Sequence, residues 1–204
     1  KDNVTFSHNR PTSSGYLGAG LDFFLWKLPG DGAEIQVIGT GEFLRYLADD
    51  APRRETFAFL QTQVTREFTP HWKAAITAEF LHFDQPVDVS LVERDLNIVQ
   101  IQGQSYTLRP SLRRIMPDGW FIEGGASLAR QHYGTIVDDE WQPGATATIG
   151  RSYGVRSELS LGYDGRERLF DTRVPRSATG TALPSGSLRI TQHEVVGQWR
   201  HHWD

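Results

Sequence analysis

The sequence contains no cysteine, so disulfide bonds and thiolate chemistry are excluded. It also has no apolar run that approaches the ~20 residues of a membrane-spanning helix. Its net charge of -4 leaves no basic field that would indicate a nucleic-acid partner. The opening KDNVTFSHNR is not a signal peptide, so either a signal was cleaved or the chain is an excerpt. We treat residues 1–204 as a single domain, because this length suits one large β domain.

Alternation of apolar and polar residues is the main pattern, and HWKAAITAEFLHF at 71–83 illustrates it. Trp72, Ile76 and Phe80 share one face, whereas Lys73 and Glu79 share the other. A period of two predicts β-strands. Similar stretches occur at 17–25, 33–43, 58–68, 105–116, 120–128, 145–163 and 187–203, and 3–8 is a possible first strand. We therefore expect an all-β fold of about ten strands, with eight or twelve as alternatives.

Short and long connections alternate along the chain. The short ones are 28–32, 69–71, 117–119 and 152–154, and the connections between them are longer and more polar. This pattern is typical of an antiparallel up-and-down transmembrane β-barrel, with tight turns at one end and long loops at the other. In the last segment the apolar residues change parity, which predicts a β-bulge near His193. Pro110 removes a ladder donor and predicts a bulge or a different register there.

The three tightest turns predict a register, in which apolar residues face each other and opposite charges pair. The expected partners are Phe68–Trp72, Glu67–Lys73, Val64–Ile76 and Leu60–Phe80 across the first turn; Met116–Trp120, Arg113–Glu123 and Leu108–Leu128 across the second; and Arg151–Val155, Ala147–Leu159 and Thr148–Glu158 across the third. In the second turn, Gly119 can adopt the left-handed conformation that such a loop requires.

Alternation alone does not decide which face is covered by what. A soluble β-sheet would bury the apolar face, whereas a membrane barrel would turn it toward lipid. The strand lengths of ~9–13 residues favour the membrane. Trp72 and Trp120 each follow a short turn directly, where interfacial aromatics belong. Arg66, Arg114 and Arg151 share the apolar parity near short turns and could extend to lipid headgroups.

The whole chain resembles Gram-negative outer-membrane β-barrels, including the C-terminal barrels that some bacteria attach to periplasmic repeat domains. The motifs that carry the resemblance are HWKAAITAEFLHF, SYTLRPSLRRIMPDGWFIEGGASLARQHY and TATIGRSYGVRSELSLGY. Such proteins often end on an aromatic residue, whereas this chain ends on Trp203 and Asp204, so further strands can follow. The resemblance implies an outer-membrane location, the lipid bilayer as partner, and a periplasmic domain or protein as a further partner.

The parity assigns side chains to three environments. We expect a charged lumen lined by Glu67, Lys73, Glu79, Arg109, Arg113, Glu123, Glu158 and Asp164. The expected lipid-facing residues are Ile76, Phe80, Leu108, Leu112, Ile122, Leu128, Leu159 and Leu161. The expected interfacial aromatics are Phe68, Trp72, Trp120 and Trp199.

Two functions follow from these expectations. The first is an integral barrel that acts as membrane anchor or scaffold, or as a narrow pore. The second is a soluble envelope β-barrel that binds a lipid or another small apolar ligand. We expect no enzyme, because the histidine candidates lack a recognisable motif; they are Ser7–His8, His82 with Asp84, His132 with Asp138 and Asp139, and His193–Glu194. No cofactor or metal is expected, since the adjacent His201 and His202 would point to opposite faces of a strand.

Overall fold

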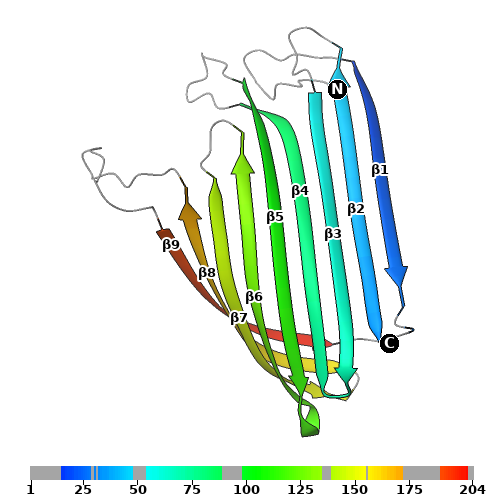
Figure 1. Cartoon of the computed structure of the whole chain (residues 1–204), viewed down its shortest axis with the longest axis vertical. Coiled ribbons are helices and arrows are strands. Elements are labelled where there is room, and N and C mark those ends of the chain that lie inside the picture. Colours follow the sequence, from blue (N-terminus) through cyan, green and yellow to red (C-terminus); the bar gives the residue numbers. More distant parts are fainter. Residues whose placement is uncertain are drawn as a thin grey trace, which may run out of the picture.

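Nine β-strands form one sheet in the computed structural model, which describes residues 15–28, 30, 32–47, 54–88, 98–134, 139–154, 156–171 and 189–201 (Figure 1). The strands are β1 (Tyr16–Lys27), β2 (Ala33–Tyr46), β3 (Arg54–Thr69), β4 (Trp72–Asp88), β5 (Ile98–Ile115), β6 (Trp120–Tyr133), β7 (Glu140–Tyr153), β8 (Ser157–Phe170) and β9 (Arg189–His201). The predicted strand at 3–8 lies outside the described residues.

Every strand pairs antiparallel with its neighbours in the sequence, in the order β1 to β9. The predicted all-β, up-and-down architecture is therefore confirmed. The strand ends that flank the tight connections lie together at the lower end in Figure 1, and the strand ends that flank the long connections lie at the upper end. We call these the short-turn end and the long-loop end. Among the described residues, no helix has the length and apolar character needed to cross a membrane. The one helical element there is a single 3-10 turn at Pro117–Gly119.

The register across the first two tight turns is largely as predicted. Across 69–71, the expected pairs are confirmed except that Trp72 faces Thr69 rather than Phe68. The register shifts at this point because Thr69 accepts a hydrogen bond from the His71 amide at 3.2 Å and tightens the turn. Across 117–119, the Arg113–Glu123 and Leu108–Leu128 pairs are confirmed. Gly119 has the expected left-handed conformation, with φ of 78°.

The third tight turn is not where the sequence placed it. The loop lies at 154–156 instead of 152–154, so Arg151 faces Leu159 rather than Val155, and Ala147 faces Tyr163 rather than Leu159. Glu158 faces Ser152, and the predicted Thr148–Glu158 pair does not form. Gly154 supplies the left-handed position with φ of 65°. This register also brings Ile149 opposite Leu161, an apolar pair that the predicted register lacks.

The two predicted bulges are absent. The β8–β9 pairing runs without a shift through Gly165–His193, so Ile190 lies on the face opposite to Val195 and Trp199. Pro110 faces Ile76 in β4, and the β5–β6 register is the same on both sides of it. The sheet therefore accommodates the missing donor by leaving a gap in the ladder rather than by inserting a residue.

Buried apolar side chains are few in this fold. Among the described residues, the buried hydrophobic side chains are Tyr46, Phe121 and Phe170. Leucine, isoleucine and aromatic side chains on the opposite face of the same strands remain exposed. The sheet therefore has no continuous apolar core, and its two faces need separate description.

Candidate functional surfaces of the curved sheet

One face of the sheet is polar and concave. All eight predicted lumen residues lie on it, as the register of β3 to β8 places them. An ion pair of 2.7 Å joins Arg113 on β5 to Glu158 on β8. In a flat sheet these strands would lie ~14 Å apart, at ~4.8 Å per strand, and a direct contact between them indicates that the sheet curves toward this face. The sweep of β7, β8 and β9 in Figure 1 follows this curvature.

At the short-turn end, the concave face carries a cluster around Phe121. This ring is 2% exposed, and the Arg113 guanidinium lies 3.5 Å from its centre. Arg113 also pairs with Glu123 at 4.0 Å, which is the predicted cross-strand partner but the more distant of the two glutamates. Gly150 lies directly opposite Phe121, and a Cβ there would meet the ring at 2.3 Å. The absence of a side chain at Gly150 thus leaves the space that the Phe121 ring occupies against β7.

At the long-loop end, a second cluster of the same composition is built around Phe170. Glu140 is almost fully buried, and the Arg168 guanidinium donates to both of its oxygens at 3.0 and 3.1 Å. Arg168 also lies 5.2 Å from the centre of the buried Phe170 ring. Tyr133 packs edge-to-face on Phe83 at 6.3 Å nearby. Each end of the concave face therefore has one buried phenylalanine beneath an arginine that pairs with glutamate.

A polar hollow of about 330 Å³ lies on the concave face, lined by five successive strands from β4 to β8. Its lining includes Thr77, Arg109, Ser127, Asp164 and Arg166. The charges in it are paired, since Arg109 contacts Glu79 at 2.9 Å and Arg166 contacts Asp164 at 2.7 Å. This hollow can hold water or a small polar solute, but it presents little unpaired charge.

The other face is apolar, convex and uncovered. All eight predicted lipid-facing residues lie on it. Ile76 and Ile122 are each 50% exposed in the middle of their strands, and Leu161 is 55% exposed. An apolar hollow of about 590 Å³ opens on this face, where the small Ala78 lies among Leu60, Phe80 and Leu108. Exposed apolar surface this extensive marks an interface with lipid or protein.

Arginines alternate with aromatic rings along the short-turn end of the convex face. Trp72 is the cross-strand partner of Arg114, whose guanidinium lies 5.5 Å from the indole centre. Trp120 is the partner of Arg151 in the same way, at 5.7 Å. We call this row the short-turn rim; its members are Arg66, Phe68, Trp72, Arg114, Trp120, Arg151, Tyr153 and Trp199. It contains all four predicted interfacial aromatics.

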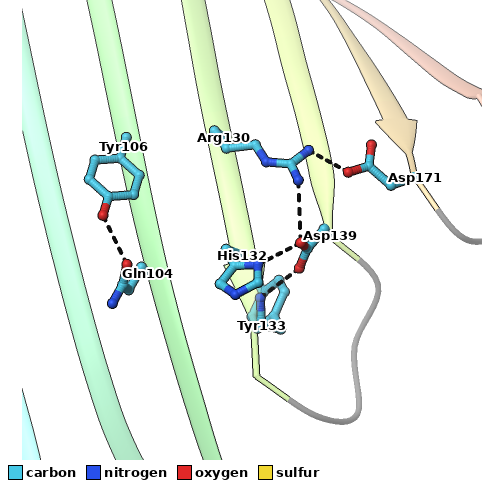
Figure 2. Close-up of polar contacts among 7 residues, drawn as sticks. All are labelled: Gln104, Tyr106, Arg130, His132, Tyr133, Asp139 and Asp171. Carbon is cyan, nitrogen blue, oxygen red and sulfur yellow. Dashed lines mark hydrogen bonds and ion pairs between the residues drawn. The ribbon is translucent and has the colours of Figure 1, made fainter.

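The long-loop end of the convex face has paired charges instead. Arg130 bridges Asp139 at 3.3 Å and Asp171 at 2.6 Å, and Figure 2 shows its two guanidinium nitrogens directed at these carboxylates. His132 Nδ1 lies 2.5 Å from Asp139. The Tyr133 amide donates to Asp139 at 2.8 Å and lowers the pKa of that carboxyl, and His132 lowers it further. Further pairs at this end are Arg54–Asp84 and Arg189–Glu167.

The described histidine candidates have different kinds of partner. Of the proposed pairs, the structure brings His132 and Asp139 together, whereas Asp84 pairs with Arg54. His193 contacts the Tyr163 hydroxyl at 2.6 Å, and His201 contacts Ser157 at 2.8 Å. Ser7, His8, Asp138 and His202 lie outside the described residues. In the described part of the chain, no three His, Asp or Glu side chains are grouped to hold a metal ion.

Sequence reasoning did not find the cluster around Phe170. Its members lie beyond the predicted strand ends, at Glu140, Arg168 and Phe170. The signal was present, because the polar parity of Asp164 continues through Arg166 and Arg168.

No protein-family model matches the chain, and no curated protein is detectably similar to it. The two faces and their rims are therefore the basis for a functional conclusion.

Proposed function

We propose that this chain forms the wall of a transmembrane β-barrel in the bacterial outer membrane, where it acts as an anchor or scaffold. The observation that carries the proposal is the polarity of the two faces of the sheet, which is the reverse of that in a soluble barrel. Its concave face holds paired charges, and its convex face holds exposed leucine and isoleucine. A barrel in lipid has this arrangement, because hydrocarbon surrounds it and water occupies its lumen.

The height of the apolar band supports a bilayer as the partner. On the convex side of β4, the stretch between the two rims extends from Trp72 to Asp84, and its apolar residues are Ala74, Ile76, Ala78 and Phe80. At ~3.3 Å per residue and a tilt of roughly 40°, this stretch covers about 30 Å along the membrane normal. The hydrocarbon core of a bilayer is ~30 Å thick. Aromatic residues at the short-turn rim would then lie at one interface and the ion pairs of Arg54 and Arg130 at the other.

Closure into a barrel needs an odd number of further strands. The edge strands β1 and β9 run in the same direction, because each strand is antiparallel to the next and an odd number of strands, β2 to β8, lies between them. One strand that runs the opposite way could pair with both edges and leave none exposed. The sequence predicts such a strand at 3–8, which makes the expected total ten.

The lumen favours a scaffold over an open channel. Its charges are mutually paired, and the clusters around Phe121 and Phe170 place large side chains on the concave face toward each end. Side chains can fill much of a barrel of this size, unlike the 16- to 18-stranded porins. A narrow pore is the second candidate, and the polar hollow of about 330 Å³ is the observation that favours it.

The soluble alternative requires the opposite curvature. A lipid-binding barrel in water would enclose its apolar face, as soluble antiparallel sheets do. Here the apolar residues Ile76 and Leu161 lie on the convex side. An envelope protein with this surface would aggregate unless another layer covered it, which is why the bilayer is the better partner.

Detergent dependence is the direct test. The protein should stay folded in detergent or lipid, precipitate without them, and migrate faster on a gel unboiled than boiled. A monodisperse, folded protein in detergent-free buffer would contradict the proposal. Planar-bilayer recordings separate the two membrane roles, since a scaffold should give no steps of conductance and a narrow pore should give small, regular ones.

A further inference from the structure

We propose that the short-turn rim is a binding surface for the phosphate groups of anionic phospholipids, and that it selects these lipids for the leaflet at that end. The inference rests on the proposed membrane function and deepens it. It names the chemistry that Arg66, Arg114 and Arg151 recognise, which is the phosphodiester of a lipid whose chains lie against the apolar band.

The rim has a regular construction. Tryptophan follows arginine by six residues across two successive tight turns, in REFTPHW at 66–72 and RIMPDGW at 114–120. Each tryptophan then stacks with the arginine of the next hairpin, so that Trp72 contacts Arg114 and Trp120 contacts Arg151. The guanidinium carbons of Arg66, Arg114 and Arg151 thus lie 5.6, 5.5 and 5.7 Å from the centre of an aromatic ring, which for Arg66 is Phe68. A planar fork held in this way suits the bidentate recognition of phosphate oxygens.

The three guanidinium groups also lack anionic partners among the described residues. Within the described strands, none of them lies within ion-pair distance of a carboxylate, and Arg151 donates only to the Asp118 carbonyl oxygen at 3.2 Å. Most other arginines of the structure do have such partners. A row of unpaired cations at the edge of an apolar band attracts anions that are themselves next to hydrocarbon. Lipid phosphates satisfy both conditions, whereas a free phosphate satisfies only the first.

The opposite rim provides an internal comparison. At the long-loop end of the same face, Arg54, Arg130 and Arg189 each contact a carboxylate. Their charge is therefore already compensated, and we expect no preference for anionic lipid there. The two rims contain the same residue type at the two ends of one apolar band, which allows charge-matched variants.

The test uses phospholipids with brominated chains, which quench tryptophan on contact. The full chain is reconstituted in lipid with Trp72 and Trp120 as its only tryptophans; the other four, Trp26, Trp141, Trp199 and Trp203, are replaced by phenylalanine. Quenching by brominated phosphatidylcholine is compared with quenching by brominated phosphatidylglycerol at low and high salt. Three backgrounds are measured: the unmodified rims, Arg66→Gln/Arg114→Gln/Arg151→Gln, and the charge-matched control Arg54→Gln/Arg130→Gln/Arg189→Gln.

We expect phosphatidylglycerol to be favoured at the short-turn rim, with a preference that falls as salt is added. Each arginine should contribute about fivefold, from ~1 kcal/mol per basic residue near an anionic surface. The short-turn triple variant should lose this preference, and the control should keep it. Equal quenching by both lipids in unmodified rims would overturn the inference alone. Absence of quenching by either lipid would instead overturn the proposed membrane function.

Discussion

The two faces of this sheet are built from the same strands but are stabilised in different ways. On the concave face, Arg113 reaches three strands across to Glu158, and Phe121 packs into the space that Gly150 leaves. On the convex face, Ile76 and Ile122 have no partners beyond their immediate neighbours and remain half exposed. The comparison teaches that specific side-chain contacts stabilise the concave face, whereas the stability of the convex face depends on the medium that surrounds it. Each of the following predictions tests one side of this contrast.

The largest effect should come from placing a charge on the convex face. Ile76→Arg puts a cation near the middle of the apolar band, which should cost about 2–4 kcal/mol if that band lies in lipid. Thr77→Arg is the matched control, since its side chain enters the polar hollow and should cost much less. Denaturant unfolding in lipid vesicles measures both. Equal losses of stability in the two variants would show that the convex and concave faces have surroundings of similar polarity.

Overpacking the concave face should have the next largest effect. In Gly150→Ala, the added methyl group meets the Phe121 ring, which lies against Gly150 with little room to move. We expect a loss of about 1–3 kcal/mol, the usual cost of overpacking. Gly124→Ala is the control, because nothing lies within 4 Å of a Cβ at that position. The same unfolding assay applies, and a Gly150→Ala variant as stable as the control would argue that Phe121 does not pack there.

Arg113 has two glutamate partners, and the nearer one should matter more. We expect a coupling of about 1.5–3 kcal/mol between Arg113 and Glu158, as for hydrogen bonds to charged groups. The coupling between Arg113 and Glu123, 4.0 Å apart, should be about 0.2–1 kcal/mol. Double-mutant cycles with glutamine and methionine substitutions measure both values.

Exchanging the charges of Arg113 and Glu123 together should be tolerated better than reversing either one, because the exchange preserves their attraction. It also tests the concave face, since Glu158 then faces a glutamate at position 113 and limits the recovery. A double exchange no better than the worse single reversal would mean that the cross-strand pair contributes nothing.

Added bulk on the convex face should have almost no effect. Ala74→Leu, Ala78→Leu and Ile76→Leu combined enlarge a surface that has no packing partner, and Ala78 lies in an open apolar hollow. In a close-packed core, each overfilled position would instead cost about 1–3 kcal/mol. The triple variant is unfolded in lipid beside the parent protein. Severe destabilisation would identify this face as a core and remove the basis for the membrane proposal.

The smallest effect is a local response to pH at the long-loop end. The pKa of Asp139 is lowered in the folded protein, so its contacts stabilise the native state above the ordinary carboxyl pKa. That contribution is lost as the pH falls through the lowered value. The Tyr133 amide, which donates to Asp139, should therefore remain protected from hydrogen exchange at neutral pH and lose protection only in acid. In Asp139→Ala, we expect the pH-dependent part of this protection to disappear; its persistence would assign it to another group.

Local rules predicted much of this molecule because alternation and turn chemistry act over a few residues. The strand at 71–83 and its pairing with β3 follow from the position of apolar residues and of Pro70 in the turn. The turn at 117–119 is as expected because Gly119 supplies the left-handed backbone. The turn between β7 and β8 was predicted two residues too early. A turn shifted by two residues leaves the same residues on each face, so alternation does not distinguish the two registers. The pairing of Ile149 with Leu161 is one apolar contact that the predicted register lacks.

The sequence by itself determined which residues share a face, because side chains of a strand alternate whatever the sheet does. It could not determine which face is concave, since exchanging inside and outside leaves the alternation unchanged. Tertiary structure decided this through contacts between distant strands, above all Arg113 with Glu158. It also decided that Glu140 and Arg168 pair at the long-loop end. Both depend on curvature, which sums small twists over many strands and is not encoded in any single segment.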